Sequence, residues 1–263
     1  MILTSSGEPP ASPGPMMAGA EPRSWDGDRN GVLVLHGFTG TPGSVMSLAE
    51  ACAGAGWTVD VPLLPGHGTG VADMMDTRFD DWLGSAAAAL EGLEQRCDRV
   101  VVMGLSMGGS LAIMLAHANP HLAGMVCVNP AVIDLPEMSE GVDAMLAAGV
   151  ELMPGTGSDI ADPSQAEIAY EETPLAPLRS LLQAAADRPF DLGDVKVPLL
   201  LMSSRQDHVV APEHSEHLAR HYGGLVDHLW LARSFHVATN DYDRHLVAAT
   251  AVAYATDRFS ALG

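Results

Sequence analysis

The sequence predicts an α/β fold in which helices flank a mostly parallel central sheet, with a small helical insertion. Continuous apolar runs, which are typical of strands buried on both faces of a parallel sheet, alternate along the chain with longer helical patterns. The 263 residues are 47% hydrophobic, which is enough for a sizeable core. One apolar run, residues 100–103, leads directly into Gly-Leu-Ser106-Met-Gly and then into a helix-forming segment. Folds of this type bind their ligands at the carboxyl ends of the strands.

Each predicted element follows from the length and period of its apolar pattern. Short continuous apolar runs are assigned as strands, and longer stretches with apolar residues three and four positions apart are assigned as helices. In chain order they are a strand at 32–35, a helix at 43–55, a strand at 57–61, a helix at 79–96, a strand at 100–103, a helix at 110–117, strands at 125–128, 197–202 and 228–231, and a helix at 242–259.

Composition shifts divide the chain. Residues 1–22 are rich in Pro, Gly, Ser and Ala and are predicted to be a disordered arm. The core is expected to comprise 23–130 and 192–263. Between these parts, residues 131–191 contain scattered prolines and no convincing strand, with short helical runs at 139–148, 164–171 and 175–186. Because this insertion follows a strand that ends near Ser106, we expect it to form a cap or lid over the site.

The charge balance limits the binding partners that we expect, and the cysteines indicate the cell compartment. The formal net charge is −20, and such a surface repels phosphate backbones and anionic lipid, so neither nucleic acid nor stable membrane insertion is expected. No run approaches the ~18 apolar residues that span a bilayer, and no secretory signal is recognised. The widely spaced Cys52, Cys97 and Cys127 indicate reduced, buried thiols and a cytoplasmic protein. The oligomeric state stays open.

The segment around Ser106 has the spacing of a nucleophile elbow. A strand, a tight Gly-x-Ser-x-Gly turn and a helix together hold a serine hydroxyl clear of the sheet on a strained turn. Gly104 and Gly108 leave room where any Cβ would collide with neighbouring backbone. The helix that follows points its partly positive N-terminus at the reaction site. Ser106 is therefore the candidate nucleophile.

A serine hydroxyl needs a base, and the base needs a carboxylate to orient it. With a nucleophile elbow the expected chain order is Ser, acid, His. Asp207 and His236 each follow a predicted strand through a short loop, so both fall on the sheet edge that holds Ser106. Asp134, after the strand at 125–128, stays open as an alternative acid.

The oxyanion of an acyl-transfer intermediate needs backbone donors. One is expected to be the N–H of Met107, the residue after the nucleophile, and the other the N–H of Phe38, in the loop after the first strand. The Phe38 ring either lines the acyl pocket or packs in the core. Met138 and Met145 in the insertion are expected to give the cap an adaptable apolar underside that contacts substrate.

Five segments resemble a known family. They are His36-Gly-Phe-Thr-Gly-Thr-Pro42, Leu64-Pro-Gly-His-Gly-Thr69, Gly104-Leu-Ser-Met-Gly-Gly109, Asp207-His-Val-Val210 and Phe235-His-Val-Ala-Thr-Asn-Asp-Tyr-Asp243. Together they resemble the bacterial monoacylglycerol lipases and small carboxylesterases of the α/β-hydrolase fold, over about residues 30–259. The resemblance implies a cytoplasmic serine esterase with a small helical cap that hydrolyses monoglycerides or short- to medium-chain esters without a cofactor.

The same resemblance assigns Glu167 to the substrate site. In this family an acidic residue at the corresponding position of the cap can meet the glycerol head of a monoglyceride; the alternative for Glu167 is a solvated helix face. Residues 138–157 match the family poorly, so the preferred acyl length stays open.

Other functions remain compatible with the motifs. A thioesterase or another triad hydrolase would use the same residues, and a ligand-binding or receptor protein can keep the same fold. His214, His217 and His221 share one face of a predicted helix, but we expect a surface stripe there and no metal.

Overall fold

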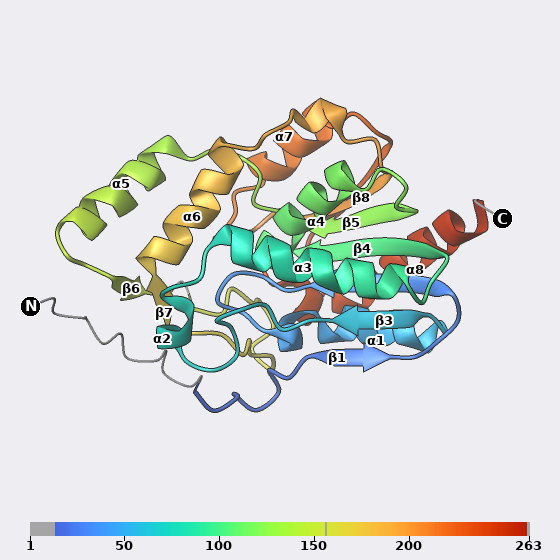
Figure 1. The fold of residues 1–263 in the computed structure, drawn as a ribbon, viewed down its shortest axis with the longest axis horizontal. Coiled ribbons are helices and arrows are strands. Elements are labelled where there is room, and N and C mark those ends of the chain that lie inside the picture. The colour runs from blue at the N-terminus through green and yellow to red at the C-terminus, as the bar shows by residue number, and fades with distance from the viewer. Residues whose placement is uncertain (1–13, 156, 262–263) are drawn as a thin grey trace, which may run out of the picture.

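The computed structural model describes residues 14–155 and 157–261. A seven-stranded sheet in the order β1-β3-β2-β4-β5-β8-β9 forms its centre (Figure 1). Its strands are β1 (Arg23–Trp25), β2 (Asn30–Leu35), β3 (Thr58–Val61), β4 (Arg99–Leu105), β5 (Gly124–Val128), β8 (Leu199–Ser204) and β9 (Val226–Leu231). All neighbouring pairs are parallel except β1 with β3. The predicted mostly parallel sheet is confirmed.

Helices cover both faces of this sheet, because the strand residues alternate between two hydrophobic cores. Leu33 and Leu35 of β2 pack on one side, and Val32 and Val34 on the other, all fully buried. The first face is covered by α3 (Phe79–Glu94), α4 (Met107–Ala118) and α7 (Glu213–His221), and the second by α1 (Met46–Gly54) and α8 (Arg244–Ala261). A short α2 (Val71–Met74) and three 3₁₀ turns, Pro42–Val45, Leu192–Asp194 and Ala238–Asn240, lie in the connections.

The insertion is only partly as predicted. α5 (Pro136–Ala147) and α6 (Leu175–Ala186) pack on each other around Val142, Leu175 and Leu182, beyond the end of the sheet (Figure 1). The strands β6 (Leu152–Pro154) and β7 (Glu172–Pro174) pair with each other, so the expectation of no strand here was wrong. The division of the chain into a core and a cap remains a prediction.

The predicted helix at 164–171 was also wrong. The Asp162 carboxylate accepts hydrogen bonds from the Ser164 N–H at 3.0 Å and from its hydroxyl at 2.7 Å. Such local bonds from Asp and Ser side chains compete with the helical pattern. Residues 158–171, here called the strap, instead cross the body in irregular conformation. At its end, Tyr170 donates its N–H to the Thr39 carbonyl at 3.1 Å and its hydroxyl to the Gly66 carbonyl at 2.8 Å.

The expectation of a disordered arm at 1–22 needs a correction for its second half. Residues 1–13 lie outside the described residues, whereas 14–22 pack against the body. The Met17 N–H donates to the Gly68 carbonyl at 2.7 Å, and Ala20 is fully buried. A few apolar side chains and backbone hydrogen bonds are enough to dock a segment whose overall composition is that of a linker.

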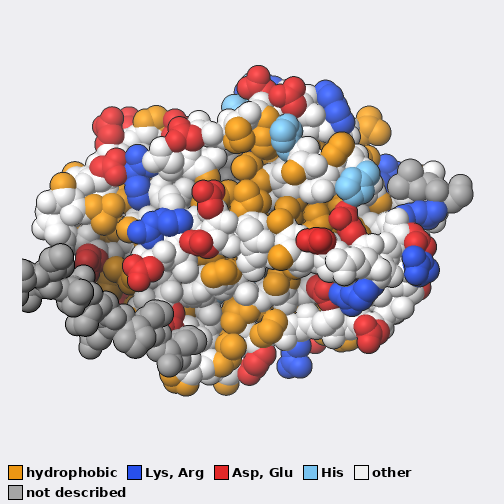
Figure 2. Space-filling model, viewed as in Figure 1, with side chains coloured by type: hydrophobic (Ala, Val, Ile, Leu, Met, Phe, Trp, Pro, Cys, Tyr) orange, Lys and Arg blue, Asp and Glu red, His pale blue; other side chains and the backbone are white. Residues whose placement is uncertain are grey.

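Acidic side chains are spread over the surface around patches of hydrophobic ones, as Figure 2 shows for one face. This distribution accords with the formal net charge of −20. Within the described residues, no helix is both long and apolar enough to cross a membrane.

Candidate active site

Ser106 lies between β4 and α4 in a strained turn. Its φ of 56° and ψ of −119° are conformations that a non-glycine residue rarely adopts. The turn can form because residues 104 and 108 are glycines and have no Cβ. A Cβ on Gly104 would lie 2.1 Å from the Gly108 carbonyl oxygen, and one on Gly108 would lie 2.2 Å from the Leu35 carbonyl oxygen. The predicted strand, turn and helix of the elbow are thus present, with glycine required at both positions.

Asp207 and His236 are joined by a hydrogen bond. His236 Nδ1–H donates to Asp207 Oδ2 at 2.8 Å, and the two side chains are only 9% and 1% exposed. The other carboxylate oxygen of Asp207 accepts the N–H groups of Val209 and Val210 at 2.9 and 2.8 Å. These bonds fix the carboxylate and place the ring proton on Nδ1, so Nε2 is left as a proton acceptor.

Ser106 and His236 line the same cavity. The Ser106 hydroxyl has no hydrogen-bond partner among the described residues. Catalytic hydrogen bonds are often long or misaligned without substrate and tighten in the substrate complex. The structure therefore brings the acid and the base into contact and the serine into their cavity, and the working triad stays a prediction.

Asn129, which the sequence reasoning missed, holds the base loop. This residue directly follows β5 and has a positive φ of 46°. Its amide oxygen accepts the Ser204 N–H at 2.7 Å, and its amide nitrogen donates to the His236 carbonyl at 2.7 Å. A polar residue directly after a buried strand next to the elbow strand was the available signal. Asp134, the alternative acid, is exposed, and Asp207 occupies the place beside His236.

Two buried histidines hold the loops after β2 and β3. His36 donates from Nδ1 to the Gly37 carbonyl at 2.9 Å and accepts the Leu64 N–H at Nε2 at 3.2 Å. Burial lowers the pKa of His36 to about 4, so the ring is neutral at pH 7. His67 donates to the Pro65 carbonyl at 3.0 Å, and burial holds its pKa well below the usual value. Both rings fix a loop and neither faces the reaction site.

The segments that carry the two expected oxyanion donors lie next to the serine. Met107 is the first residue of α4, where the N–H groups of the first turn have no intrahelical acceptor. The loop that carries Phe38 approaches so closely that a Cβ on Gly37 would lie 3.4 Å from the Ser106 Cβ. The Phe38 ring both packs on Trp82, with ring centres 5.5 Å apart, and lines the cavity. The oxyanion hole itself stays a prediction.

The cavity has a volume of about 430 Å³, within the range of small-molecule sites. Met145 and Met153 from the insertion line it, and Met138 does so at a position that leaves its side chain 47% exposed. The wall is mainly apolar, with polar side chains on a few residues. Those are Thr39, Ser106, Asp159, Glu167, Thr173, His214 and His236.

Glu167 extends from the strap into this cavity. Its carboxylate accepts the Ser44 hydroxyl at 2.7 Å, and desolvation by burial raises the pKa of the carboxyl. Because the strap is not helical, the alternative of a solvated helix face was wrong; the glycerol-binding role stays a prediction.

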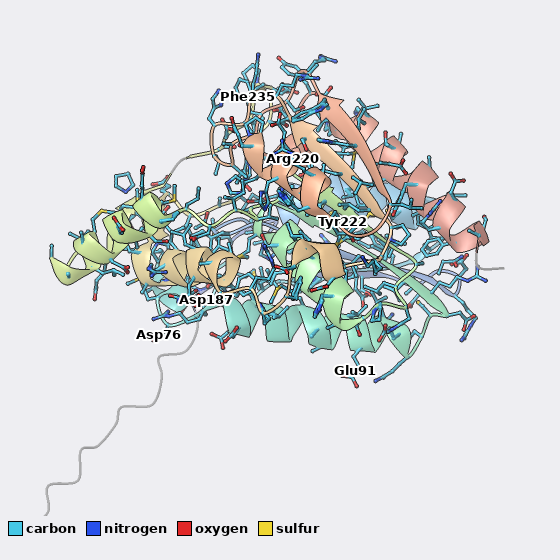
Figure 3. All side chains as sticks on the ribbon, turned by 90° about the horizontal axis from the view of Figure 1, so that it is seen from above. Asp76, Glu91, Asp187, Arg220, Tyr222 and Phe235 are labelled. Carbon is cyan, nitrogen blue, oxygen red and sulfur yellow. The ribbon has the colours of Figure 1, made fainter. Side chains whose placement is uncertain are left out.

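The side chains of His214, His217 and His221 do not come together as a set of metal ligands. His214 is buried, so the expected surface stripe was wrong at this position, and its Nδ1 accepts the N–H groups of Val132 and Ile133 at 2.9 and 3.1 Å. The rings of His217 and His221 contact each other at a tilt of 36°. Among the residues described, no group of three or more His, Cys, Asp or Glu side chains is placed to hold a metal. Figure 3 shows α7, which bears Arg220 and ends before Tyr222, and a separate loop that carries Phe235 directly before His236.

Comparisons with known proteins agree with this geometry. The model of the family described as serine aminopeptidase, S33, matches residues 27–243. The chain is 40% identical over 237 residues to a thermostable monoacylglycerol lipase of Bacillus sp. (strain H-257), covering 89% of this chain and 93% of the relative. It is 26% identical over 231 residues to a carboxylesterase of Bacillus subtilis (strain 168), covering 86% and 92%. A solved structure of the metagenome-derived lipolytic enzymes LipS and LipT superposes with a TM-score of 0.87 at 39% identity, covering 92% of this chain and 100% of that one.

Proposed function

The chain belongs to the α/β-hydrolase family described as serine aminopeptidase, S33, and from that premise we propose that it is a serine esterase that cleaves monoacylglycerols or short- to medium-chain acyl esters. The observation that carries the proposal is the His236–Asp207 hydrogen bond of 2.8 Å at the wall of an apolar cavity that Ser106 also lines. The relatives named monoacylglycerol lipase and carboxylesterase support the substrate class.

In the acylation step, Ser106 Oγ attacks the ester carbonyl carbon while His236 Nε2 takes the hydroxyl proton. Asp207 holds the ring and stabilises the imidazolium, because its buried carboxylate faces Nδ1–H at 2.8 Å. The N–H groups of Met107 and Phe38 donate to the oxyanion. When the tetrahedral intermediate collapses, the C–O bond of the ester breaks and the alcohol leaves with the proton from His236.

Deacylation repeats the steps with water as the nucleophile. His236 Nε2 takes a proton from water as its oxygen attacks the acyl carbon, and then returns that proton to Ser106 Oγ as the carboxylic acid is released. No further reagent is needed, so the cycle requires no cofactor.

The cavity wall supports the choice of substrate. Three methionines on the insertion side offer an adaptable apolar surface for an acyl chain. Glu167 places one carboxylate in the same cavity, where it can accept hydrogen bonds from the hydroxyls of a glycerol head. An ester with an apolar acyl part and a small polar alcohol fits this division.

A substrate panel tests the proposal. p-Nitrophenyl esters of graded chain length are compared with 1- and 2-monoglycerides, acyl-CoA and an aminoacyl arylamide, with Ser106→Ala as the control. Turnover of the esters, together with fluorophosphonate labelling of Ser106, is expected. Faster turnover of acyl-CoA or of the arylamide would point to thioester or peptide chemistry, and no labelling of Ser106 would point to a non-catalytic binding protein.

A further inference from the structure

We propose that Asp159, a residue of the strap, is a positioning residue for the catalytic base and sets the geometry between the Asp207 and His236 loops. The inference rests on the proposed function, because it assigns a role within that same triad. It starts from one side chain that contacts both catalytic loops and belongs to neither.

The Asp159 carboxylate accepts three hydrogen bonds. One oxygen, Oδ2, accepts the backbone N–H of His236 at 3.0 Å and that of His208 at 3.1 Å. The other oxygen, Oδ1, accepts Nδ1–H of the His208 ring at 2.8 Å. A fourth bond comes from the main chain, since the Asp159 carbonyl accepts the Val237 N–H at 3.1 Å. Asp159 thus bonds to the base residue itself, to the residue after it and to the residue after the acid.

Those two loops contact each other through the His236–Asp207 bond and through the edge-on packing of the His208 and Phe235 rings, whose centres lie 4.5 Å apart, and Asp159 adds a tie from outside both loops. β8 and β9 are parallel neighbours whose register pairs Ser204 with Leu231, and their loops leave the sheet beyond that point. The side-chain bond between His236 and Asp207 cannot by itself fix the backbone of either loop. Asn129 holds the His236 carbonyl from the sheet side, and Asp159 holds the His236 N–H from the strap side. The peptide groups on both sides of the catalytic histidine are therefore held by side chains from other segments.

The hydrogen bonds of the Asp159 carboxylate are expected to be strong. The Asp159 side chain is 13% exposed, so solvent competes little for its oxygens. Hydrogen bonds to an ionised carboxylate are about twice as strong as neutral ones. A displacement of about 1 Å in a catalytic group can cost about 100-fold in rate. Loss of Asp159 would let the His236 backbone shift by such an amount without unfolding the sheet.

The arrangement also couples the strap to the chemistry. Glu167 and Asp159 both project from the strap into the cavity, so the segment that contributes to the substrate wall also holds the base. A strap that leaves its place removes both contacts together.

The test compares Asp159→Ala with a matched control on the same strap. The Asp162 side chain also ties the strap to the body, through Arg244 at 3.1 Å, and it bonds to neither residues 207–208 nor residues 235–237. Asp159→Ala removes all three carboxylate hydrogen bonds, whereas in Asp159→Asn the amide oxygen can still accept both backbone N–H groups while the NH₂ group donates to Nδ1 of the other His208 tautomer. Asp162→Ala removes the other carboxylate anchor of the strap.

We expect Asp159→Ala to lower kcat for a p-nitrophenyl ester by about 100-fold, with KM unchanged, and to slow fluorophosphonate labelling of Ser106 by a similar factor. The downfield proton resonance of the His236–Asp207 hydrogen bond should broaden or disappear. Asp159→Asn should recover most of the lost kcat, and Asp162→Ala should keep kcat, the labelling rate and the resonance. His208→Ala, which retains the contact to the His236 N–H, should lose less kcat than Asp159→Ala.

Three results would overturn the inference. They are wild-type kcat and labelling in Asp159→Ala, equal losses in Asp159→Ala and Asp162→Ala that follow a common fall in melting temperature, or an unchanged downfield resonance in Asp159→Ala. If Asp159→Ala does not fold, Asp159→Glu, which displaces the carboxylate by one methylene, decides by the same criteria. Failure of the proposed function would look different, because wild type itself would then turn over acyl-CoA or the arylamide faster than the esters, or its Ser106 would not label.

Discussion

At the scale of single residues, the site depends on backbone positions that only one residue type can occupy. Ser106 is held at a φ of 56°, and strain of this kind costs about 1–3 kcal/mol, which the surrounding structure must offset. The offset is possible because Gly104 and Gly108 let β4, α4 and the end of β2 approach within backbone contact. The reactive geometry is therefore built on the absence of two side chains.

Gly108→Ala should lower the free energy of unfolding by about 1–3 kcal/mol and abolish esterase activity, because its Cβ would meet the Leu35 carbonyl oxygen at 2.2 Å. The matched control is Gly84→Ala in the middle of α3, where a Cβ meets nothing within 4 Å. That change should raise the free energy of unfolding by about 0.5–1 kcal/mol and keep activity. Denaturant unfolding and ester turnover are measured for both variants. A Gly108→Ala enzyme with wild-type stability and activity would contradict the prediction.

His36 gives the stability a pH dependence of known sign. Its pKa is about 4 in the folded chain against an ordinary 6.5, so the unfolded chain binds the proton more tightly and stability falls as pH drops from 6.5 to 4. The full effect is about 3 kcal/mol. The difference in unfolding free energy between wild type and His36→Gln should shrink by that amount from pH 7 to pH 4, in denaturant titrations at each pH. A difference that does not change with pH would refute it.

At the scale of elements, the insertion decides what can enter the site. α6 faces the cavity with Leu178, Leu181 and Leu182 and with one small side chain, that of Ala185. Next to it, Ala186 is exposed and does not line the cavity. Neighbouring positions on one helix therefore differ in their access to substrate.

Ala185→Leu should shorten the space for the acyl chain. We expect kcat/KM for the longest p-nitrophenyl ester that wild type accepts to fall by about 10- to 100-fold, while that for the acetate ester stays within about twofold, because each lost methylene site is worth about 1–3 kcal/mol. Ala186→Leu is the control and should leave both unchanged. Equal losses for short and long esters would show that Ala185 is not next to the acyl chain.

The element scale also shows where pattern reading fails. The apolar runs of the core predict β2, β4 and β5 to within two residues at each end, and the helical period in the insertion predicts α6 to the residue. The predicted helix at 164–171 in the strap is absent. Its apolar spacing is helical, but the Asp162 and Ser164 side chains form local hydrogen bonds instead. The three-residue strands β6 and β7 are too short to give a period, and only their mutual pairing makes them strands.

At the scale of the whole molecule, all three cysteines are buried and free. Desolvation raises the pKa of Cys52 to about 12 and raises that of Cys127 as well. A thiol that remains protonated and is covered by packed side chains reacts slowly with disulfide reagents.

Thiol labelling should therefore report unfolding. Below the denaturant midpoint, Cys52 and Cys127 should stay unlabelled for as long as esterase activity persists, and both should label above it. Mass spectrometry of peptides, with activity measured in parallel, checks this. Rapid labelling of either cysteine in fully active enzyme would show that the two cores open locally.

The sequence by itself determined the sheet, its covering helices and the identity of the candidate triad. Those features follow from local causes: the continuous apolar runs, the two glycines of the elbow, and the rule that parallel strands end at one edge. It could not determine which polar groups from distant segments hold that triad in place. Asn129, Asp159 and the Ser44–Glu167 contact involve residues 75 or more positions apart in several of their bonds, and no local period records such pairs. The pairing of β5 with β8 brings Asn129 to the base loop, and folding of the strap across the sheet edge brings Asp159 and Glu167 to their partners. Hydrogen bonds between loops depend on where the packed elements leave each chain segment.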